Sequence, residues 1–266
     1  MHISNGSSGT DRLVVISGAA KGIGEAAAIR FRRQGVLVIG VATSPPTGVL
    51  ADDPGVRFVV GDVADASTWA AVRSMYTEMG VAPEALVLNA ARAVHGTVLD
   101  LSIEEWRRVF EINVFGCVLG AKACLPAMIE RGGGSVVVVS SVNGWMAEQD
   151  LIAYSCTKAT LIEFAKSLAV DHAHQGIRAN VVAPGTTDTP AFRRGMESSG
   201  DAPGWTSARA ARNPLGRILS ADEVANAIWF LAGPESVGMT GSVVTVDGGL
   251  TASFDYRGPG APTYRR

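Results

Sequence analysis

The chain has 266 residues, of which 47% are hydrophobic and 18% charged, with a formal net charge of −2. This near-neutral balance argues against nucleic acid or an anionic membrane surface as a partner. No uninterrupted apolar run approaches the ~20 residues that span a bilayer, and the N-terminus lacks the apolar core of a signal peptide. We therefore expect a soluble, cytoplasmic protein with reduced cysteines.

Short apolar runs rich in β-branched residues predict strands at residues 13–16, 36–41, 56–60, 85–88, 135–139, 177–183 and 242–246. Helical segments alternate with them at residues 25–33, 66–79, 102–129, from 151 onward and 220–232. This alternation predicts an α/β fold with a seven-stranded, mostly parallel, doubly wound sheet and helices on both faces.

The domain boundaries follow from composition. We expect residues 1–11 to be a disordered leader, residues 12–250 to form one domain and residues 251–266 to be a C-terminal tail. The stretch 191–213 is rich in Gly, Ser and Ala, which favours a mobile flap.

A glycine-rich turn follows the first strand and leads directly into a helical segment. It reads Ser17-Gly18-Ala19-Ala20-Lys21-Gly22-Ile23-Gly24. Glycines let the backbone approach a ligand closely, and a helix N-terminus offers free N–H groups to a phosphate. The context indicates a pyrophosphate site, although the G-x-x-x-G-x-G spacing differs from the general dinucleotide pattern. The alternative is a turn that binds nothing.

The second strand ends at Ala42-Thr43-Ser44-Pro45, where the dinucleotide fingerprint would place a carboxylate against the adenosine ribose. No carboxylate stands there to repel a 2′-phosphate. Thr43 and Ser44 can donate hydrogen bonds to such a phosphate, and Lys21 in the glycine-rich turn can add positive charge. The sequence therefore favours NADP(H), with NAD(H) possible, unless these residues only form a turn.

Tyr154 and Lys158 are four residues apart in a predicted helix and therefore share one face. We expect the Lys158 ammonium to lower the pKa of the Tyr154 phenol from ~10 toward working pH. The phenol would then be a usable general acid or base. Alone the pattern is weak, because Tyr-x-x-x-Lys also occurs among ordinary surface residues.

Together these motifs resemble the classical short-chain dehydrogenase/reductase family over residues 13–249. The sequence at residues 38–44 is similar to that of the family's NADPH-using ketoacyl reductases. The matching residues are Ser17-Gly18-x-x-x-Gly22-x-Gly24, Asp62-Val63, Asn89-Ala90, Asn113, Ser141, Tyr154-x-x-x-Lys158, Pro184-Gly185 with Thr189, and Asp247-Gly248-Gly249. Leu88 and Ala91 depart from the family's usual Asn-Asn-Ala-Gly, without removing a catalytic group.

The resemblance implies a single Rossmann-type domain and roles for individual residues. It makes Tyr154 the catalytic acid/base and Lys158 the group that lowers its pKa and holds the nicotinamide ribose. Ser141 would polarise the substrate oxygen, and Asn113 would keep a proton-relay water in place. The implied cofactor contacts are Gly18, Gly22, Ile23 and Gly24 at the pyrophosphate, Asp62 and Val63 at the adenine, Asn89 and Thr43 on the adenosine side, and Pro184, Gly185, Thr187 and Thr189 with Tyr154 and Lys158 at the nicotinamide end.

The substrate and metal expectations rest on position. Trp145, Met146 and Gln149 stand between Ser141 and Tyr154, so we expect them to line an apolar substrate pocket, with ordinary packing as the alternative. We expect no metal site, because His172 and His174 are two apart on a helix and cannot face one ion.

The sequence thus predicts an NAD(P)-dependent oxidoreductase that interconverts a secondary alcohol and a ketone, in a homodimer or homotetramer as the resemblance implies. The alternative is a catalytically idle nucleotide-binding sensor or scaffold on the same fold. The intact set Asn113, Ser141, Tyr154 and Lys158 favours the enzyme, and a dehydratase or epimerase is a third option.

Overall fold

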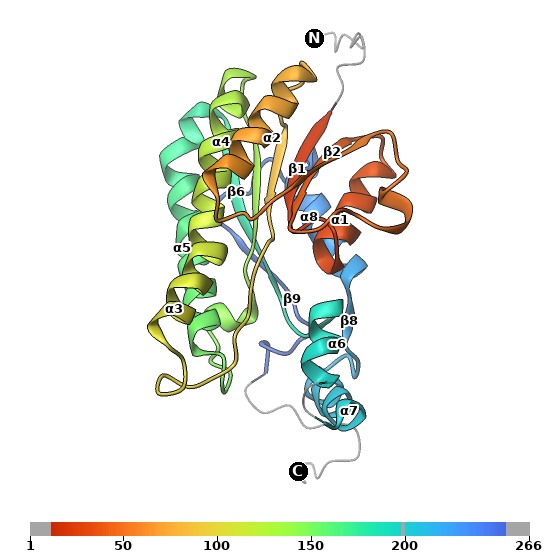
Figure 1. The fold of residues 1–266 in the computed structure, drawn as a ribbon, viewed down its shortest axis with the longest axis vertical. Coiled ribbons are helices and arrows are strands. Elements are labelled where there is room, and N and C mark those ends of the chain that lie inside the picture. The colour runs from red at the N-terminus through yellow and green to blue at the C-terminus, as the bar shows by residue number, and fades with distance from the viewer. Residues whose placement is uncertain (1–11, 198–199, 254–266) are drawn as a thin grey trace, which may run out of the picture.

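The computed structural model describes residues 12–197 and 200–253 (Figure 1). The expected leader, residues 1–11, and all of the expected tail beyond residue 253 lie outside the described residues. The main sheet has the order β3-β2-β1-β4-β5-β6-β9. Its strands are β1 Leu13–Ser17, β2 Leu37–Ala42, β3 Val56–Val60, β4 Ala85–Leu88, β5 Gly134–Val139, β6 Ile177–Pro184 and β9 Val243–Val246.

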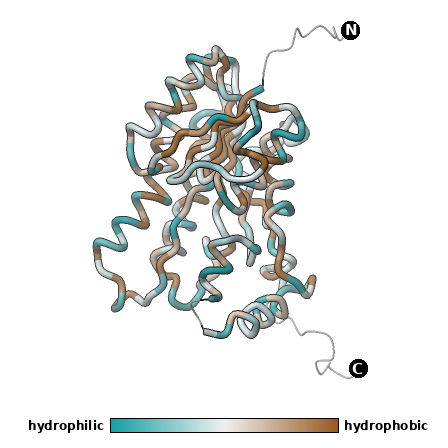
Figure 2. The backbone as a smooth tube through the Cα atoms, turned by 45° about the vertical axis from the view of Figure 1, so that its right-hand side comes forward, coloured by the Kyte–Doolittle hydropathy of each residue, from teal (hydrophilic) through white to brown (hydrophobic). Residues whose placement is uncertain are grey.

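The predicted doubly wound sheet is confirmed, and all of its neighbouring strands pair in parallel. Every residue of β1 and β4 is buried, because helices cover both faces of the sheet. Figure 2 shows the most hydrophobic residues gathered in the central strands. This double burial is what made the strands recognisable as unbroken apolar runs.

Two helical layers enclose the sheet. One core lies between the sheet and α2 Ala66–Glu78, α4 Gly116–Glu130 and α5 Ile152–His172. The other lies against α1 Gly22–Arg32 and α8 Ala221–Ala232 (Figure 1). Short 3-10 turns, η1 Gly48–Leu50, η3 Val142–Gly144, η4 Ala173–Gln175 and η5 Pro234–Ser236, fill connections between these elements.

The long helix predicted over residues 102–129 is interrupted. α3 Ile103–Phe110 begins at a capping box of Ser102 and Glu105, passes through the π-helical turn η2 Glu111–Phe115, and continues as α4. By length and composition Ile103–Glu130 could cross a membrane, but 56% of its most apolar window is buried within the protein, and the core helix of a folded domain passes the same test.

The stretch predicted as a flap contains two helices instead. α6 Pro190–Glu197 and α7 Ala202–Arg212 lie beyond the carboxyl ends of the strands, at the foot of Figure 1. A second, two-stranded parallel sheet joins this region to the body through β7 Thr187–Asp188 and β8 Leu219–Ser220. The composition indicated a flap and not helices, since neither helix buries a residue and so neither carries an apolar stripe.

Candidate active site

The glycine-rich turn lies between the ends of β1 and β2. Gly18 has a φ of 69°, and its N–H donates to the carbonyl of Val41 at 2.7 Å. Gly22 has a φ of 60°, and a Cβ there would lie 3.3 Å from Thr189. At Gly24 a Cβ would collide with the Gly18 carbonyl. The turn is therefore too tightly packed for side chains at these positions, and only glycine allows the sharp backbone turn that a pyrophosphate cradle requires.

Ser17 and Asn89 fasten this turn to the end of β4. The Ser17 hydroxyl accepts hydrogen bonds from the N–H groups of Asn89 at 2.9 Å and Ala90 at 3.1 Å. The Asn89 amide in turn donates to the Ser17 carbonyl at 3.0 Å. Asn89 therefore lies beside Gly18, where the sequence placed it, and its amide supports the turn.

The predicted adenosine-side residues lie on neighbouring strand ends. The Asp62 carboxylate accepts from the Ala64 N–H at 2.9 Å and forms an ion pair with Arg108 of α3. Val63 is buried, and Trp69 donates to its carbonyl at 2.8 Å. Thr43 is exposed directly after β2, and Lys21 is exposed in the adjoining turn. Contacts of these residues with an adenosine group stay predictions.

Tyr154 and Lys158 share one face of α5, as predicted, with the ammonium nitrogen 5.4 Å from the centre of the phenol ring. The predicted direction of the Tyr154 pKa shift is wrong for this structure. Burial raises the pKa of Tyr154 to about 12, the Ser141 side chain opposes the rise, and the negative charge of Glu148 adds to it. A phenol with this pKa keeps its proton at neutral pH.

Lys158 is almost completely buried, and its ammonium donates to the carbonyl of Val139 at 2.8 Å. Burial lowers the pKa of Lys158 to about 8, although the nearby Cys117 opposes the shift. The Ser140 hydroxyl donates to the Lys158 carbonyl at 2.7 Å. The end of β5 thus fixes both ends of this lysine against the sheet.

Ser141 lies at the carboxyl end of β5, where it caps η3. Its hydroxyl oxygen accepts from the N–H of Asn143 at 3.1 Å, and the hydroxyl donates to the carbonyl of Pro184 at 3.4 Å. The second bond is long, so the hydroxyl proton can be redirected to a better acceptor in the pocket at little cost.

Asn113 lies in the π turn η2 and is fully buried. Its amide oxygen accepts from the Arg92 N–H at 2.7 Å, and its nitrogen donates to the Arg92 carbonyl and the Thr157 hydroxyl, both at 2.9 Å. Thr157 then donates to the Tyr154 carbonyl at 2.7 Å. Asn113 is therefore a satisfied amide that ties the first turn of α5 to the loop after β4, and its part in a proton relay stays a prediction.

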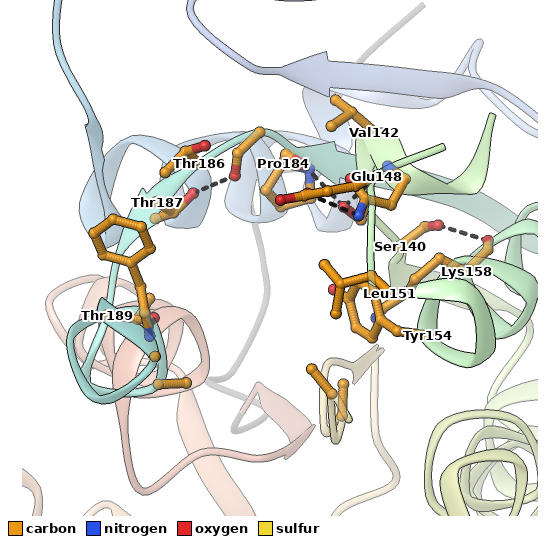
Figure 3. A pocket seen from close by; sticks show the side chains of 18 of the residues that line it. Ser140, Val142, Glu148, Leu151, Tyr154, Lys158, Pro184, Thr186, Thr187 and Thr189 are labelled. Carbon is orange, nitrogen blue, oxygen red and sulfur yellow. Dashed lines mark hydrogen bonds between the residues drawn. The ribbon is translucent and has the colours of Figure 1, made fainter. Parts of the chain in front are cut away.

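A pocket of about 380 Å³ opens at the carboxyl ends of the strands. Figure 3 shows Tyr154, Lys158 and Leu151 on one side of it and Thr186, Thr187 and Thr189 on the other. Sequence-predicted residues that line it are Ile23, Asn89, Ser141, Met146, Tyr154, Lys158, Pro184, Gly185, Thr187 and Thr189. The pocket thus joins the glycine-rich turn to the phenol and the serine.

Two predicted substrate contacts, Trp145 and Gln149, are exposed and do not line this pocket. The residues that do include Glu148 from the same loop and Arg209 and Arg212 from α7. Glu148 forms an ion pair with Arg209. Sequence reasoning missed them because the two partners are 61 residues apart and α7 was not recognised as a helix.

Among residues 12–197 and 200–253, no group of three or more His, Cys, Asp or Glu side chains is placed to hold a metal ion.

The family model for enoyl-(acyl carrier protein) reductases matches residues 18–251. The cis-4-hydroxycyclohexanecarboxylate dehydrogenase of Sinomonas cyclohexanicum is 37% identical over 248 residues, which cover 91% of this chain and 97% of that protein. This chain belongs to the short-chain dehydrogenase/reductase family. It is a dehydrogenase/reductase of that family, an NAD(P)-dependent oxidoreductase acting on alcohols and ketones.

Solved structures of this family superimpose over nearly the whole chain. The ligand-free aldohexose dehydrogenase of Thermoplasma acidophilum matches with a TM-score of 0.86 and 32% identity, covering 94% of this chain and 97% of that one. The L-sorbose reductase of Gluconobacter frateurii, complexed with NADPH and L-sorbose, matches with a TM-score of 0.84 and 27% identity, covering 92% and 98%. The predicted seven-stranded family fold is thereby confirmed.

Proposed function

We propose that the protein interconverts a secondary alcohol and a ketone, with Tyr154 as the proton donor and acceptor. One observation carries the proposal: Tyr154, Ser141 and Lys158 line the same pocket as Ile23 of the glycine-rich turn and as Thr187 and Thr189. A bound nicotinamide cofactor supplies the hydride in such a reaction. The protein residues must then orient the carbonyl, donate to its oxygen and deliver a proton.

The side chains suit the reduction direction. Because the pKa of Tyr154 is raised to about 12 by burial, the phenol holds a proton that it can give to a developing alkoxide. The Ser141 hydroxyl makes only a long hydrogen bond to the Pro184 carbonyl and could instead donate to the developing alkoxide oxygen. Lys158 keeps a fixed place beside the phenol through its bond to Val139.

We propose NADP(H) as the preferred cofactor, with NAD(H) possible. The glycine-rich turn suits a dinucleotide, since it leads into a helix N-terminus and its packing at Gly24 leaves no room for a side chain. The end of β2 carries Ala42 and Thr43 where a carboxylate would disfavour a 2′-phosphate, and Lys21 lies exposed in the turn beside it. The related L-sorbose reductase was crystallised with NADPH.

A fluorescence titration with NADPH and NADH, followed by a panel of ketones and alcohols, tests both proposals. We expect turnover that depends on Tyr154, so the Tyr154→Phe variant should bind cofactor but lose activity. An idle sensor would instead bind the cofactor both as the parent protein and as the Tyr154→Phe variant, and neither protein would reduce a ketone. Tighter binding of NADH than NADPH would contradict the cofactor proposal.

We also propose a homodimer or homotetramer in the cytoplasm. The family resemblance supports this assembly, and Phe115 of η2 and Val170 of α5, which expose 56% and 79% of their surface, leave apolar side chains uncovered in one copy. Analytical ultracentrifugation of the purified chain distinguishes these assemblies from a monomer.

A further inference from the structure

A charged cluster lines the pocket between the loop after β5 and helix α7. The Glu148 carboxylate pairs with Arg209 through one oxygen and accepts from the Asn143 amide at 3.1 Å through the other. Both charged side chains of the pair are about three-quarters buried, with 24% and 21% of their surface exposed. Glu148 also lies close enough to Tyr154 for its charge to raise the pKa of that phenol. The cluster is therefore part of the wall that faces the reacting group.

The cluster contains one carboxylate, Glu148, and two guanidinium groups, Arg209 and Arg212, so it carries a net positive charge. Burial raises the pKa of the Glu148 carboxyl, but the hydrogen bonds from Arg209 and Asn143, followed by the charges of Arg209 and Arg212, lower it below its ordinary value. Arg212 lines the pocket and makes no side-chain hydrogen bond or ion pair with any residue in 12–197 or 200–253. Arg212 is exposed on the pocket wall, and its guanidinium, unpaired among the described residues, is a ready receptor for a carboxylate because its planar fork matches two oxygens.

The other lining residues limit the polarity and the size of a ligand that fits this pocket. Met146, Leu151 and Phe192 supply apolar surface. A pocket of about 380 Å³ that also has to hold a nicotinamide ring leaves room for a small substrate only. Such a ligand would place its carbonyl at Tyr154 and an anionic group at α7.

We infer that the natural substrate is a small hydroxy or keto carboxylate whose carboxylate binds Arg212, with Arg209 held beside it by Glu148. This inference rests on the proposed function and adds the substrate class. The Glu148–Arg209 pair has a defined part in it, because it neutralises the only acidic side chain that lines this pocket among the described residues. Without that pair, the Glu148 carboxylate would repel an anionic substrate.

The test compares ketones that differ only in charge. Reduction of 3-oxobutanoate, 4-oxopentanoate and 4-oxocyclohexanecarboxylate is measured against their methyl esters and against neutral ketoses, with NADPH as the reductant. We expect kcat/KM for at least one acid to exceed that of its ester by roughly 10-fold or more, as for a charge-assisted hydrogen bond. The advantage should appear mainly in KM and should shrink as salt is added.

Variants then locate the receptor. Arg212→Gln should lower the ratio of acid to ester kcat/KM by about 10-fold. Arg194→Gln removes the same charge from an exposed position on α6 outside the pocket lining, and should keep that ratio within about twofold.

The outcomes distinguish the carboxylate inference from the proposed oxidoreductase function. Tyr154-dependent reduction of esters or ketoses with no preference for any acid, or an Arg212→Gln ratio equal to that of Arg194→Gln, would overturn the carboxylate inference and leave the proposed function standing. Cofactor binding without reduction of any acid, ester or ketose would overturn both.

Discussion

Replacing Asn113 by Ala tests whether this residue acts through position. The side chain is fully buried and makes three hydrogen bonds, two to the Arg92 backbone and one to the Thr157 hydroxyl. A buried polar group left without a partner costs ~1–3 kcal/mol. Because the Arg92 N–H, the Arg92 carbonyl and the Thr157 hydroxyl all lose this partner, we expect the free energy of unfolding to fall by about 2–4 kcal/mol.

Urea denaturation measures this loss. The midpoint temperature of thermal unfolding should fall by roughly 2–4 °C for each kcal/mol lost in a chain of this size. The matched control is Asn226→Ala, which removes an exposed amide that accepts from Arg30 at 3.2 Å. The control should change stability by less than about 0.5 kcal/mol. An Asn113→Ala chain as stable as the control would refute the interpretation of Asn113 as a buried brace.

A double-mutant cycle with Thr157→Val identifies the partner. Each single change leaves one member of the Asn113–Thr157 bond unpaired, whereas the double variant removes both groups. The two losses should therefore add to more than the loss in the double variant, with a coupling energy of at least about 0.5 kcal/mol. Strictly additive losses would show that the hydrogen bond contributes nothing to stability.

Three further predictions concern the cofactor, the proton and the helix cap. Tyr154→Phe should abolish ketone reduction and change the Kd for NADPH by only a few fold in a fluorescence titration; retained turnover would remove Tyr154 as the acid/base. Ala42→Asp should lower the NADPH-to-NADH ratio of kcat/KM by ~10-fold, about 1.4 kcal/mol, and an unchanged ratio would contradict our interpretation of the β2 end. The Arg217 side chain, followed by the Ser220 N–H, lowers the pKa of Glu223 to about 2 from 4.5, so its stabilisation is full above pH 4.5 and is lost as the pH falls toward 2. Glu223→Gln should accordingly be less stable than the parent at neutral pH and equal to it near pH 2, as followed by urea denaturation at each pH.

The strands were predictable because parallel strands buried on both faces appear as unbroken apolar runs, as in Leu13–Ser17. The helices α6 and α7 were not, because they bury little and therefore lack an apolar stripe. A local signal was present nonetheless. Thr189 accepts from the Phe192 N–H at 3.2 Å just before Pro190, and Asp201 caps α7 in the same way. A capping residue followed by proline could have located both helices.

In the site, spacing predicted which residues share a face but could not give their burial. Tyr154 and Lys158 do lie together, yet desolvation outweighs the hydrogen bond from Ser141 and raises the pKa of the phenol. The bond from Lys158 to Val139 joins a helix to a strand end, and nothing local in the sequence indicates it. The same is true of Glu148 and Arg209, whose pairing depends on how α7 packs. Contacts of this kind follow from the tertiary fold.

The π turn at Glu111–Phe115 has a consequence for the two halves of the helix that it divides. One surplus residue in a turn rotates everything beyond it by about 100° relative to an unbroken α-helix. Asn113 can thereby face Arg92 and Thr157 while Gly116 and Gly120 further along stay against Val63 and Trp69. Removing a single residue here would restore a regular helix and rotate one half relative to the other, so the number of residues in this turn, more than their side chains, keeps the loop after β4, helix α5 and the sheet in register.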